Sequence, residues 1–279
     1  MKPFLKWAGG KRWFVGKYSN FLPLEYNRYI EPFMGSGAIF FWLRPKKALI
    51  SDCNKDLIES YLTLKYQPDA VWKKLIVHQR NHSKVYYYKI RSSSPRNAVT
   101  RAARFIYLNR TCFNGLYRVN QHGKFNVPKG TKNTVIFPND DFSAVSKLLE
   151  NCTLLTQDFE KTIRLAGKGD LLYIDPPYTV QHNNNNFVKY NEQLFRWADQ
   201  ERLENSLKQA ASRGAFILIS NADSKCIHDL YSDQLWSKIC VTRYSVLAAN
   251  ALNRKPTSEL VISNYLNEKG AQVNPRGGN

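Results

Sequence analysis

The sequence predicts an α/β fold: a doubly wound, mostly parallel sheet with a second, helix-rich domain inserted into it. Short apolar runs bounded by polar or turn residues occur at 29–30, 47–51, 171–174 and 215–219, as is typical of strands buried on both faces. The later runs alternate with helical patterns, and that alternation favours a parallel sheet. At 279 residues, the chain is long enough for one large domain or two smaller ones.

The second half of the chain carries the clearest helix and strand patterns. A helix is expected over 199–213, and Gly214 supplies its C-terminal stop. Its apolar positions follow the spacing of one helix face: Leu203, Leu207, Ala210 and Ala211. A final strand is expected over 259–265.

The middle of the chain has more helix signals than either end. A helix is expected over 98–108, and a β-hairpin is expected within 114–130, turning around residues 121–123. We therefore assign 57–145 to an inserted domain, and 1–56 together with 146–279 to the domain that contains the sheet. Four consecutive asparagines, 183–186, are interpreted as a mobile loop.

The net charge of +19 is concentrated in the inserted domain. Residues 57–138 hold 15 Lys and Arg but only two acidic residues, which places +13 there and +6 in the rest of the chain. Basicity that served only solubility would be spread evenly. The concentration favours a surface that binds a polyanion, with nucleic acid as the leading candidate.

Other features of the composition narrow the class of protein. The first residues form no apolar signal segment, and no run approaches the roughly 18 apolar residues of a membrane span. We therefore expect a soluble, cytoplasmic protein with no membrane partner. The five cysteines are scattered without a C-x-x-C pair, which argues against a zinc site and suits reduced thiols. No catalytic triad or metal site is expected among the isolated histidines: His78, His82, His122, His182 and His228.

A glycine-rich turn, FMGSG (33–37), follows the first predicted strand and precedes a helix that begins near Ala38. Glycine lets the backbone turn tightly and approach a ligand, although helix–strand packing alone also explains such glycines. Asp52 ends the next predicted strand, where doubly wound folds bind the hydroxyl groups of a ribose. NAD and S-adenosylmethionine both fit such a site, and the incomplete G-x-G-x-x-G spacing favours S-adenosylmethionine.

The motif DPPY (175–178) directly follows the predicted strand 171–174. An amino group on an aromatic ring is a poor nucleophile, because its lone pair is delocalised into the ring. Two acceptors for its hydrogens, the Asp175 carboxylate and the Pro176 carbonyl, would favour a pyramidal nitrogen aimed at a methyl donor. The prolines fix φ and add no competing N–H, and Tyr178 offers a ring on which a base outside its helix can stack. An ordinary Pro-Pro turn is the alternative.

Several motifs taken together resemble the DNA adenine methyltransferase (Dam) family. They are FLKWAGGK (4–11), EPFMGSG (31–37), SDCN (51–54), NRTCFNGLYRVN with GKFNVP (109–128) and DPPY (175–178), and they occur in the family's order over nearly the whole chain. The resemblance implies a Rossmann-like catalytic domain that binds S-adenosylmethionine, and an inserted target-recognition domain that binds double-stranded DNA. It implies methyl transfer to N6 of a flipped-out adenine, without a metal. GATC is the commonest target in this family.

The resemblance also assigns residues. Catalysis would depend on Asp175, Pro176 and Tyr178. Cofactor binding would involve Trp7, Lys11, Glu31, Gly35, Gly37, Asp52, Asp158 and Asp175. Within that set, Asp52 would hold the ribose hydroxyls and Asp175 would face the methionine moiety and the target base.

Some of these assignments compete with simpler explanations. Without the resemblance, Trp7 would be interpreted as a core residue and Lys11 as a solvated charge. Asp158 would read the adenine of the cofactor, but a helix N-cap explains an aspartate there equally well. Many relatives begin the glycine motif with Asp, whereas this chain has Glu31, which keeps the charge but reaches further.

The predicted hairpin has the right chemistry to read bases. A two-stranded ribbon fits the major groove, where Arg reads guanine and Asn or Gln reads adenine. The candidate DNA-binding residues are Arg118, Asn120, Gln121, His122 and Lys124. Other basic residues of the insert would meet phosphates or solvent: Lys73, Lys74, Arg101 and Arg104.

Other functions remain open at this point. RNA and protein-glutamine methyltransferases share the chemistry but commonly show N-P-P-Y, and the Asp175 motif and basic hairpin argue against them. A DNA-binding protein that has lost catalysis would act by occupancy alone, and the intact DPPY argues against it. A cognate restriction endonuclease is a partner that the sequence does not decide.

Overall fold

The computed structural model of the chain describes residues 1–179, 195–244 and 256–274. The asparagine run 183–186, interpreted above as a loop, lies outside the described residues.

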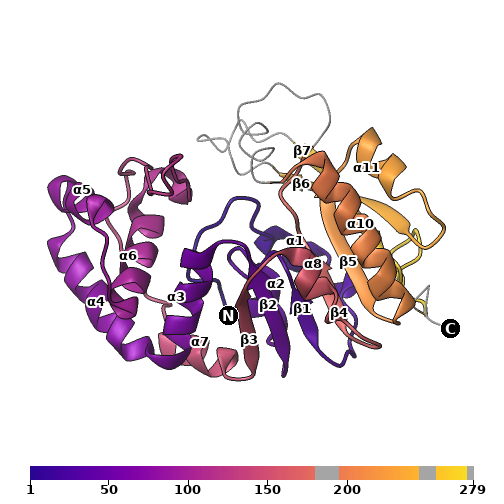
Figure 1. Cartoon of the computed structure of the whole chain (residues 1–279), viewed down its shortest axis with the longest axis horizontal. Coiled ribbons are helices and arrows are strands. Elements are labelled where there is room, and N and C mark those ends of the chain that lie inside the picture. The colour runs from indigo at the N-terminus through magenta and orange to yellow at the C-terminus, as the bar shows by residue number, and fades with distance from the viewer. Residues whose placement is uncertain (180–194, 245–255, 275–279) are drawn as a thin grey trace. The chain divides into compact units, whose positions relative to one another are not determined.

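Seven strands form one sheet in the order β3-β2-β1-β4-β5-β7-β6 (Figure 1). The strands are β1 (Tyr29–Glu31), β2 (Ala48–Asp52), β3 (Cys152–Thr156), β4 (Leu171–Ile174), β5 (Phe216–Ala222), β6 (Ser237–Tyr244) and β7 (Pro256–Ser263). β1 is parallel to β2 and β4, and β4 is parallel to β5, whereas β7 is antiparallel to β5 and β6. The predicted α/β class with a mostly parallel sheet is confirmed.

The order of the strands reverses between β1 and β4. From β1 the chain continues to β2 on one side, and from β4 it continues to β5 on the other side. Ile30 pairs with Leu172, so the two strands run side by side and end at the same edge of the sheet. Doubly wound sheets bind their ligands outside the carboxyl ends of the strands at such a reversal. Glu31 ends β1 there, and the DPPY motif follows β4.

The chain divides into two compact units. Unit 1 comprises Met1–Arg12, Met34–Lys46 and Ser51–Thr156, and unit 2 comprises Trp13–Phe33, Lys47–Ile50 and Gln157–Asn279. The predicted insert 57–145 lies entirely within unit 1, and its role as a target-recognition domain remains a prediction.

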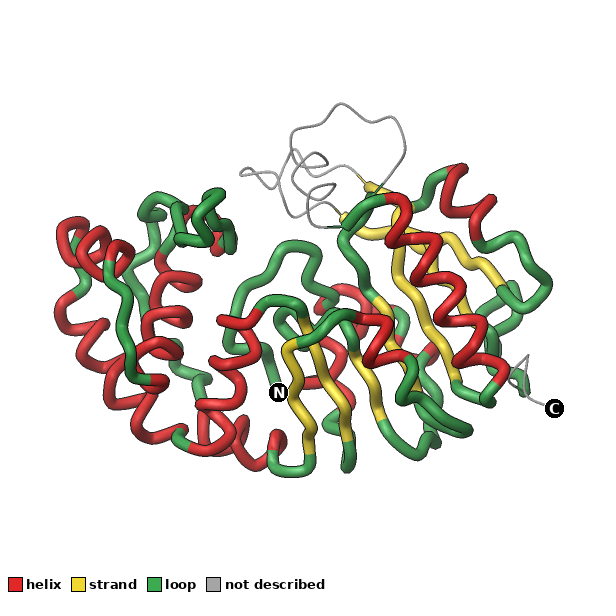
Figure 2. The backbone as a smooth tube through the Cα atoms, in the orientation of Figure 1, coloured by secondary structure: helices red, strands yellow, loops and turns green. Residues whose placement is uncertain are grey.

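Helices dominate unit 1 (Figure 2). They are α2 (Ala38–Leu43), α3 (Lys55–Tyr66), α4 (Pro68–Asn81), α5 (Lys84–Ser92), α6 (Ala98–Thr111), the short 3-10 turn η2 (Phe113–Gly115) and α7 (Phe142–Leu149). α6 packs against α3, α4 and α5, and its residues 105–111 are all buried. Side-chain N-caps begin four of these helices, because Asn54, Ser83, Asn97 and Asp141 each accept a hydrogen bond from the backbone three residues on.

In unit 2, helices cover the sheet. They are α1 (Arg12–Lys17), the 3-10 turn η1 (Ser19–Phe21), α8 (Phe159–Ile163), α10 (Trp197–Ser212) and α11 (Lys225–Leu230). α10 packs against α8 and β5, with Leu203, Leu207, Ala210 and Ala211 all buried, as the 199–213 pattern predicts (Figure 1). Gly214 follows the helix with φ +83°, a left-handed conformation that favours glycine. Among the described helices, none combines the length and apolar character that crossing a membrane requires.

Candidate active site

The glycine turn after β1 is built around Trp7. Gly35 has φ +48°, and a Cβ on it would lie 2.6 Å from Cδ1 of the Trp7 indole. Both the backbone conformation and the close approach of the ring therefore exclude a side chain at this position. Gly37 has φ +64°, directly precedes α2, and its N–H donates to the Met34 carbonyl at 2.7 Å. Trp7 itself is half-buried, and its contact with a cofactor remains a prediction.

Asp52 fastens this turn to the end of β2. Its Oδ2 accepts from the Gly35 N–H at 3.1 Å, and its Oδ1 accepts from the Asn54 N–H at 2.9 Å. Burial raises the pKa of Asp52, and the N–H groups of Asn54 and Gly35 oppose that rise. A carboxylate offers about four lone-pair sites, so Asp52 retains acceptor capacity for hydroxyl groups of a ligand.

Lys11 is buried, with 2% of its surface exposed, and its Nζ donates to the Gly9 carbonyl at 3.2 Å. The interpretation of Lys11 as a solvated charge is therefore wrong. A buried ammonium group is stable only where hydrogen bonds or opposite charge offset its desolvation. Burial of the Lys11 ammonium group within the KWAGGK segment therefore requires compensating contacts around it.

In unit 2, the tyrosine of the DPPY motif is held by a buried carboxylate. The Tyr178 hydroxyl donates to Oε2 of Glu259 at 2.9 Å, and the Ser220 hydroxyl donates to the same oxygen at 3.4 Å. Glu259 lies on β7 and is only 2% exposed. Burial, then the negative charges of Asp175 and Glu259, raise the pKa of Tyr178 well above its ordinary value. Tyr178 therefore remains neutral and keeps its hydroxyl as a donor.

Asp175 and Pro176 begin the motif directly after β4. Asp175 is half-buried and Pro176 is buried, so the carboxylate is partly accessible just beyond the end of β4. Glu31, at the end of β1, is 3% exposed. Burial and then the charge of Glu31 raise the pKa of Tyr29 well above its ordinary value. Two carboxylates, Glu31 and Asp175, thus end the two strands that flank the reversal.

Asp158 is the N-cap of α8, as the simpler explanation holds. Its Oδ1 accepts from the Glu160 N–H at 2.9 Å, and its two oxygens accept from the Arg202 guanidinium at 2.9 Å each. Burial raises the pKa of Asp158, but the bonds from Arg202 and Glu160 outweigh this and leave that pKa below its ordinary value. A contact between Asp158 and a cofactor adenine remains a prediction.

The chain reverses within 114–130 as predicted, but without two regular strands. One antiparallel bridge joins Val119 to Phe125, and backbone hydrogen bonds run from Asn120 to Lys124 and from Asn126 to Arg118. The cause lies in the side chain of Asn120, whose Oδ1 accepts from the N–H groups of His122 and Lys124 at 3.0 Å each. This Asx-type loop replaces the two-residue turn of a longer ladder.

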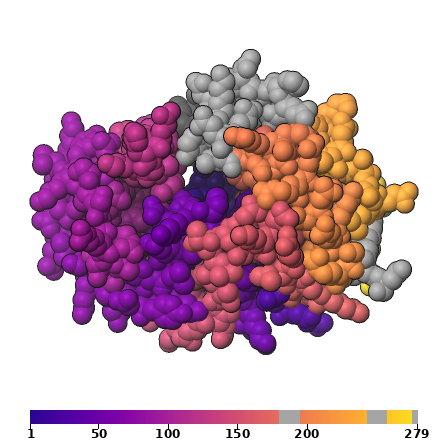
Figure 3. Space-filling view, in the orientation of Figure 1, coloured from indigo at the N-terminus to yellow at the C-terminus, as the bar shows by residue number. Residues whose placement is uncertain are grey.

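The candidate DNA-binding residues all lie at the surface of this loop. Arg118, Asn120, Gln121, His122 and Lys124 are exposed. Figure 3 shows this part of the chain, in magenta, on the surface of unit 1. The carbonyl oxygen of Asn120 is already engaged, and the Nε of Arg118 donates to Oδ1 of Asn126 at 2.9 Å. Gln121 and His122 sit at the tip.

The loop borders an open cavity of about 480 Å³ within unit 1. Basic residues that the sequence assigns to phosphates line it, but their guanidinium groups have protein partners. Arg101 pairs with Glu59 at 3.0 Å, and Arg104 donates to the carbonyls of Ile90 at 2.9 Å and Arg91 at 2.6 Å. These contacts fix α3, α5 and α6 to one another. Of the four candidates, Lys73 and Lys74 are exposed on α4.

Sequence reasoning missed the residues that link these motifs inside unit 1. Tyr117 stacks on Trp7 with ring centroids 5.5 Å apart, and its hydroxyl donates to Asp56 at 3.1 Å. Asn109 clamps the N-terminal segment, since it accepts from the Lys6 N–H at 2.9 Å and donates to the Lys6 carbonyl at 2.8 Å. Tyr117 and Asn109 both lie within the motif NRTCFNGLYRVN, so membership of that motif was the sequence signal that could have identified them.

Arg110, the neighbour of Asn109, is fully buried and also structural. It donates to the Phe4 carbonyl at 3.1 and 2.9 Å and to the Val135 carbonyl at 2.7 Å, and it pairs with Asp140. The Asn-Arg pair that opens the longest family motif therefore holds the N-terminal segment against α6 and is not available to DNA.

Known proteins of one enzyme family are similar to this chain in sequence. Residues 7–246 match the model of the family described as D12 class N6 adenine-specific DNA methyltransferase. A Type II methyltransferase of Lactococcus lactis subsp. cremoris is 39% identical over 276 residues, which cover 96% of each chain. A Type II methyltransferase of Methanocaldococcus jannaschii is 35% identical, covering 95% of this chain and 99% of the relative. A DNA adenine methylase of Haemophilus influenzae is 33% identical, covering 93% and 92%. The chain belongs to the D12 class of N6 adenine-specific DNA methyltransferases.

Proposed function

We propose that this methyltransferase takes its methyl group from S-adenosylmethionine and transfers it to adenine N6 within GATC, after the adenine has left the duplex. The observation that carries the proposal is the DPPY motif. It directly follows β4 at the reversal of strand order, and its tyrosine is held by a buried glutamate.

The residues of the glycine turn and the ends of the strands fit the cofactor. When bound, S-adenosylmethionine would supply a methyl group activated by the adjacent sulfonium. Asp52 would accept hydrogen bonds from the ribose hydroxyls with the lone pairs that Gly35 and Asn54 leave. Because Gly35 and Gly37 have no side chains, the ligand would be able to approach the backbone of the turn closely. Trp7, Lys11, Glu31, Asp158 and Asp175 complete the proposed set.

Asp175 and Pro176 would hold the amine. The carboxylate and the carbonyl each accept one hydrogen of the N6 group, which withdraws the lone pair from the ring and orients it for attack. Pro176 is buried and lacks an N–H, so its carbonyl has a fixed direction and no local donor competes for it. The Tyr178 ring would stack on the base, with its plane fixed by the bond to Glu259.

The loop 114–130 would read the DNA sequence. Arg118, Gln121, His122 and Lys124 have exposed side chains with the donors and acceptors that major-groove readout requires. Asn120 could offer its amide N–H₂, although its carbonyl oxygen shapes the loop. Lys73 and Lys74 on α4 are the remaining candidates for phosphate contacts.

Methyl transfer to short duplexes tests these proposals separately. Purified protein would receive radiolabelled S-adenosylmethionine with a duplex that contains GATC, the same duplex with GTTC, or GATC already methylated at N6. We expect incorporation into the first duplex alone. Incorporation into all duplexes that contain adenine would overturn GATC as the target sequence but not the methyltransferase activity. No incorporation into any of them, with the labelled donor intact, would contradict the proposed donor.

Base flipping is tested with 2-aminopurine in place of the target adenine. We expect its fluorescence to rise on binding, because the base leaves its stack, and to rise less when the analogue is at a neighbouring position. Two relatives are named Type II methyltransferases, so a cognate restriction endonuclease remains a proposed partner, and the cytoplasm the proposed compartment.

A further inference from the structure

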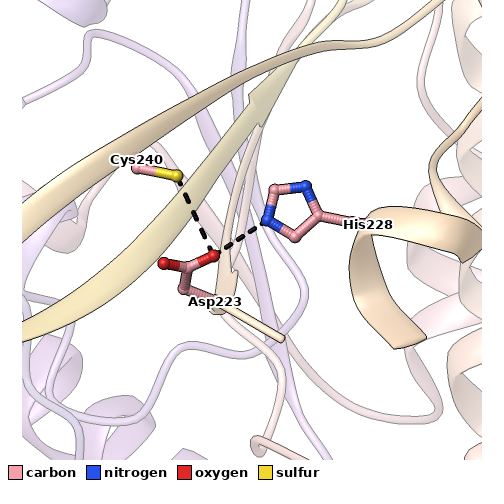
Figure 4. Close-up of side chains that lie close together, drawn as sticks. All are labelled: Asp223, His228 and Cys240. Carbon is pink, nitrogen blue, oxygen red and sulfur yellow. Dashed lines mark hydrogen bonds and ion pairs between the residues drawn. The ribbon is translucent and has the colours of Figure 1, made fainter. Parts of the chain in front are cut away.

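Three side chains that are unrelated in the sequence meet at one edge of the unit 2 sheet (Figure 4). Asp223 directly follows β5, His228 lies on α11, and Cys240 lies on β6. Oδ1 of Asp223 lies 2.8 Å from Nε2 of His228 and 3.8 Å from Sγ of Cys240. The three potential ligand atoms all lie within 4.8 Å of one another.

The spatial arrangement of the three groups argues against a catalytic site in which the thiol is the nucleophile and the imidazole is its base. In such a relay the imidazole would lie between the thiol and the carboxylate. Here one carboxylate oxygen contacts both of the other groups, so Asp223 is at the centre. A carboxylate, an imidazole and a thiol whose ligand atoms all lie within 4.8 Å of one another are instead close enough to bind one cation together.

The two spacings measured from Asp223 lie near those of tetrahedral coordination. Zinc bonds of about 2.0 Å to oxygen and nitrogen and 2.3 Å to sulfur, at tetrahedral angles, put oxygen about 3.3 Å from nitrogen and about 3.5 Å from sulfur. The observed separations of 2.8 and 3.8 Å need shifts of only a few tenths of an ångström. The Ser258 hydroxyl also hydrogen-bonds the Asp223 carboxylate, the kind of outer contact that orients a metal ligand.

We propose that Asp223, His228 and Cys240 bind a thiophilic divalent cation of the Zn²⁺ type, with a water molecule as fourth ligand. The mixed ligand set excludes Mg²⁺ and Ca²⁺, which prefer oxygen alone, and a carboxylate with a thiolate neutralises the two positive charges. The site does not take part in methyl transfer and is independent of the function proposed above.

The position of the site gives it a structural role. β7 lies between β5 and β6, and Glu259 on β7 pairs in register with Ala222 on β5 and Val241 on β6. Asp223 and Cys240 are the immediate neighbours of those two partners. A cation there would join the residue after β5 to β6 across β7, the strand whose Glu259 accepts a hydrogen bond from Tyr178.

Cobalt titration tests the site, because Co²⁺ bound to a thiolate in a tetrahedral site absorbs in the near ultraviolet and visible. The full chain, stripped with chelator and kept reduced, would be titrated with Co²⁺ and then with competing Zn²⁺. We expect one saturable equivalent in the wild type. Cys240→Ser should lose the thiolate absorption, and His228→Gln and Asp223→Asn should each bind at least tenfold more weakly.

Two other cysteines provide matched controls. Cys226 is on α11, two residues from His228, and Cys53 is exposed in unit 1. Cys226→Ser and Cys53→Ser should titrate as the wild type does. Zn²⁺ should raise the melting temperature of the wild type and of both controls but not that of Cys240→Ser, with circular dichroism confirming that each variant is folded. Absence of saturable binding, or a thiolate band that survives in Cys240→Ser, would overturn the proposal.

Discussion

The hydroxyl of Tyr178 lies 2.9 Å from Oε2 of Glu259, a carboxylate buried on a strand 81 residues further along the chain. A long-range hydrogen bond of this kind fixes both the height and the tilt of the ring. Tyr178 is the group proposed to stack on the target base, so Glu259 becomes a positioning residue for the reaction.

We predict that Glu259→Ala lowers kcat about tenfold or more, because it leaves the half-buried Tyr178 hydroxyl without this acceptor, at a cost of about 1–3 kcal/mol. Glu259→Gln keeps an oxygen acceptor and should lose less. Single-turnover methylation measures the effect. The control is the Tyr178→Phe background, where no hydroxyl remains to be held, so that Glu259→Ala should there cost much less. Equal losses in both backgrounds would contradict positioning through the ring.

Removal of the Asp175 carboxylate should affect the chemical step most. Asp175→Ala is expected to lower kcat by about 10²–10³-fold or more, since one of two acceptors for the amine disappears. The fold should persist, because Asp175 is half-buried in the segment after β4. A burst experiment with circular dichroism as a control for folding checks both points. A variant that methylates at the wild-type rate would refute the proposed role.

Loss of the Asp52 carboxylate should weaken binding of the cofactor but not binding of DNA. We expect Asp52→Ala to weaken S-adenosylmethionine binding by about 1–3 kcal/mol, measured by calorimetry, with little change in DNA affinity without cofactor. Asn54→Ala is the matched control: it removes the N-cap of α3 and leaves the Asp52 carboxylate in place. It should cost stability of about 1 kcal/mol and little cofactor affinity. A cofactor loss as large as that of Asp52→Ala would attribute the effect to disturbance of the turn.

Substitutions in the base-reading loop and substitutions of phosphate contacts should change DNA binding in different ways. Arg118→Ala should relax discrimination at one base pair by about 1–3 kcal/mol, whereas Lys73→Ala should weaken all sequences alike and flatten the salt dependence by about one unit of slope. Binding to a cognate duplex and its single-base variants across salt concentrations separates the two. Uniform loss of affinity in Arg118→Ala, with discrimination unchanged, would remove the loop from sequence recognition.

Acid should destabilise unit 1 through His78. Burial, with a smaller effect of the Lys74 charge, lowers the pKa of His78 to about 4, from 6.5. Between these values the unfolded chain binds a proton that the folded chain does not, so the free energy of unfolding falls as pH decreases from 6.5 to about 4. The full effect is on the order of 3 kcal/mol.

His78→Gln should therefore reduce the slope of stability against pH within that window and leave the slope above pH 7 unchanged. Urea unfolding at closely spaced pH values measures it. The difference between the two proteins excludes the carboxylates, which titrate in both. Identical slopes would show that His78 is protonated as readily in the folded state as in the unfolded chain.

The parts of this architecture that were predictable have local signals. Apolar runs between turn residues mark β1, β2, β4 and β5, and the spacing of Leu203 and Leu207 marks α10. β6 escaped prediction because its sequence, SKICVTRY, mixes charged and apolar residues, as suits a strand at the edge of a sheet.

The contacts that could not be predicted join residues far apart in the chain. Glu259 is a buried charged residue on β7, and two of its partners, Tyr178 and Ser220, lie 81 and 39 residues away along the chain. Arg101 had the appearance of a phosphate contact because Glu59, its partner, lies 42 residues away. Periodicity carries no information about such pairs, and it cannot bring together Asp223, His228 and Cys240 either.

The packing of Trp7 on Gly35 sets an order in which these positions can change during evolution. A methyl group at Gly35 would lie 2.6 Å from the indole, so any side chain there requires a smaller residue at position 7 first. The reverse order is open, since a smaller residue at 7 leaves glycine unstrained. Even then the left-handed φ of +48° penalises every residue with a Cβ. Packing in this turn therefore constrains position 35 more tightly than position 7.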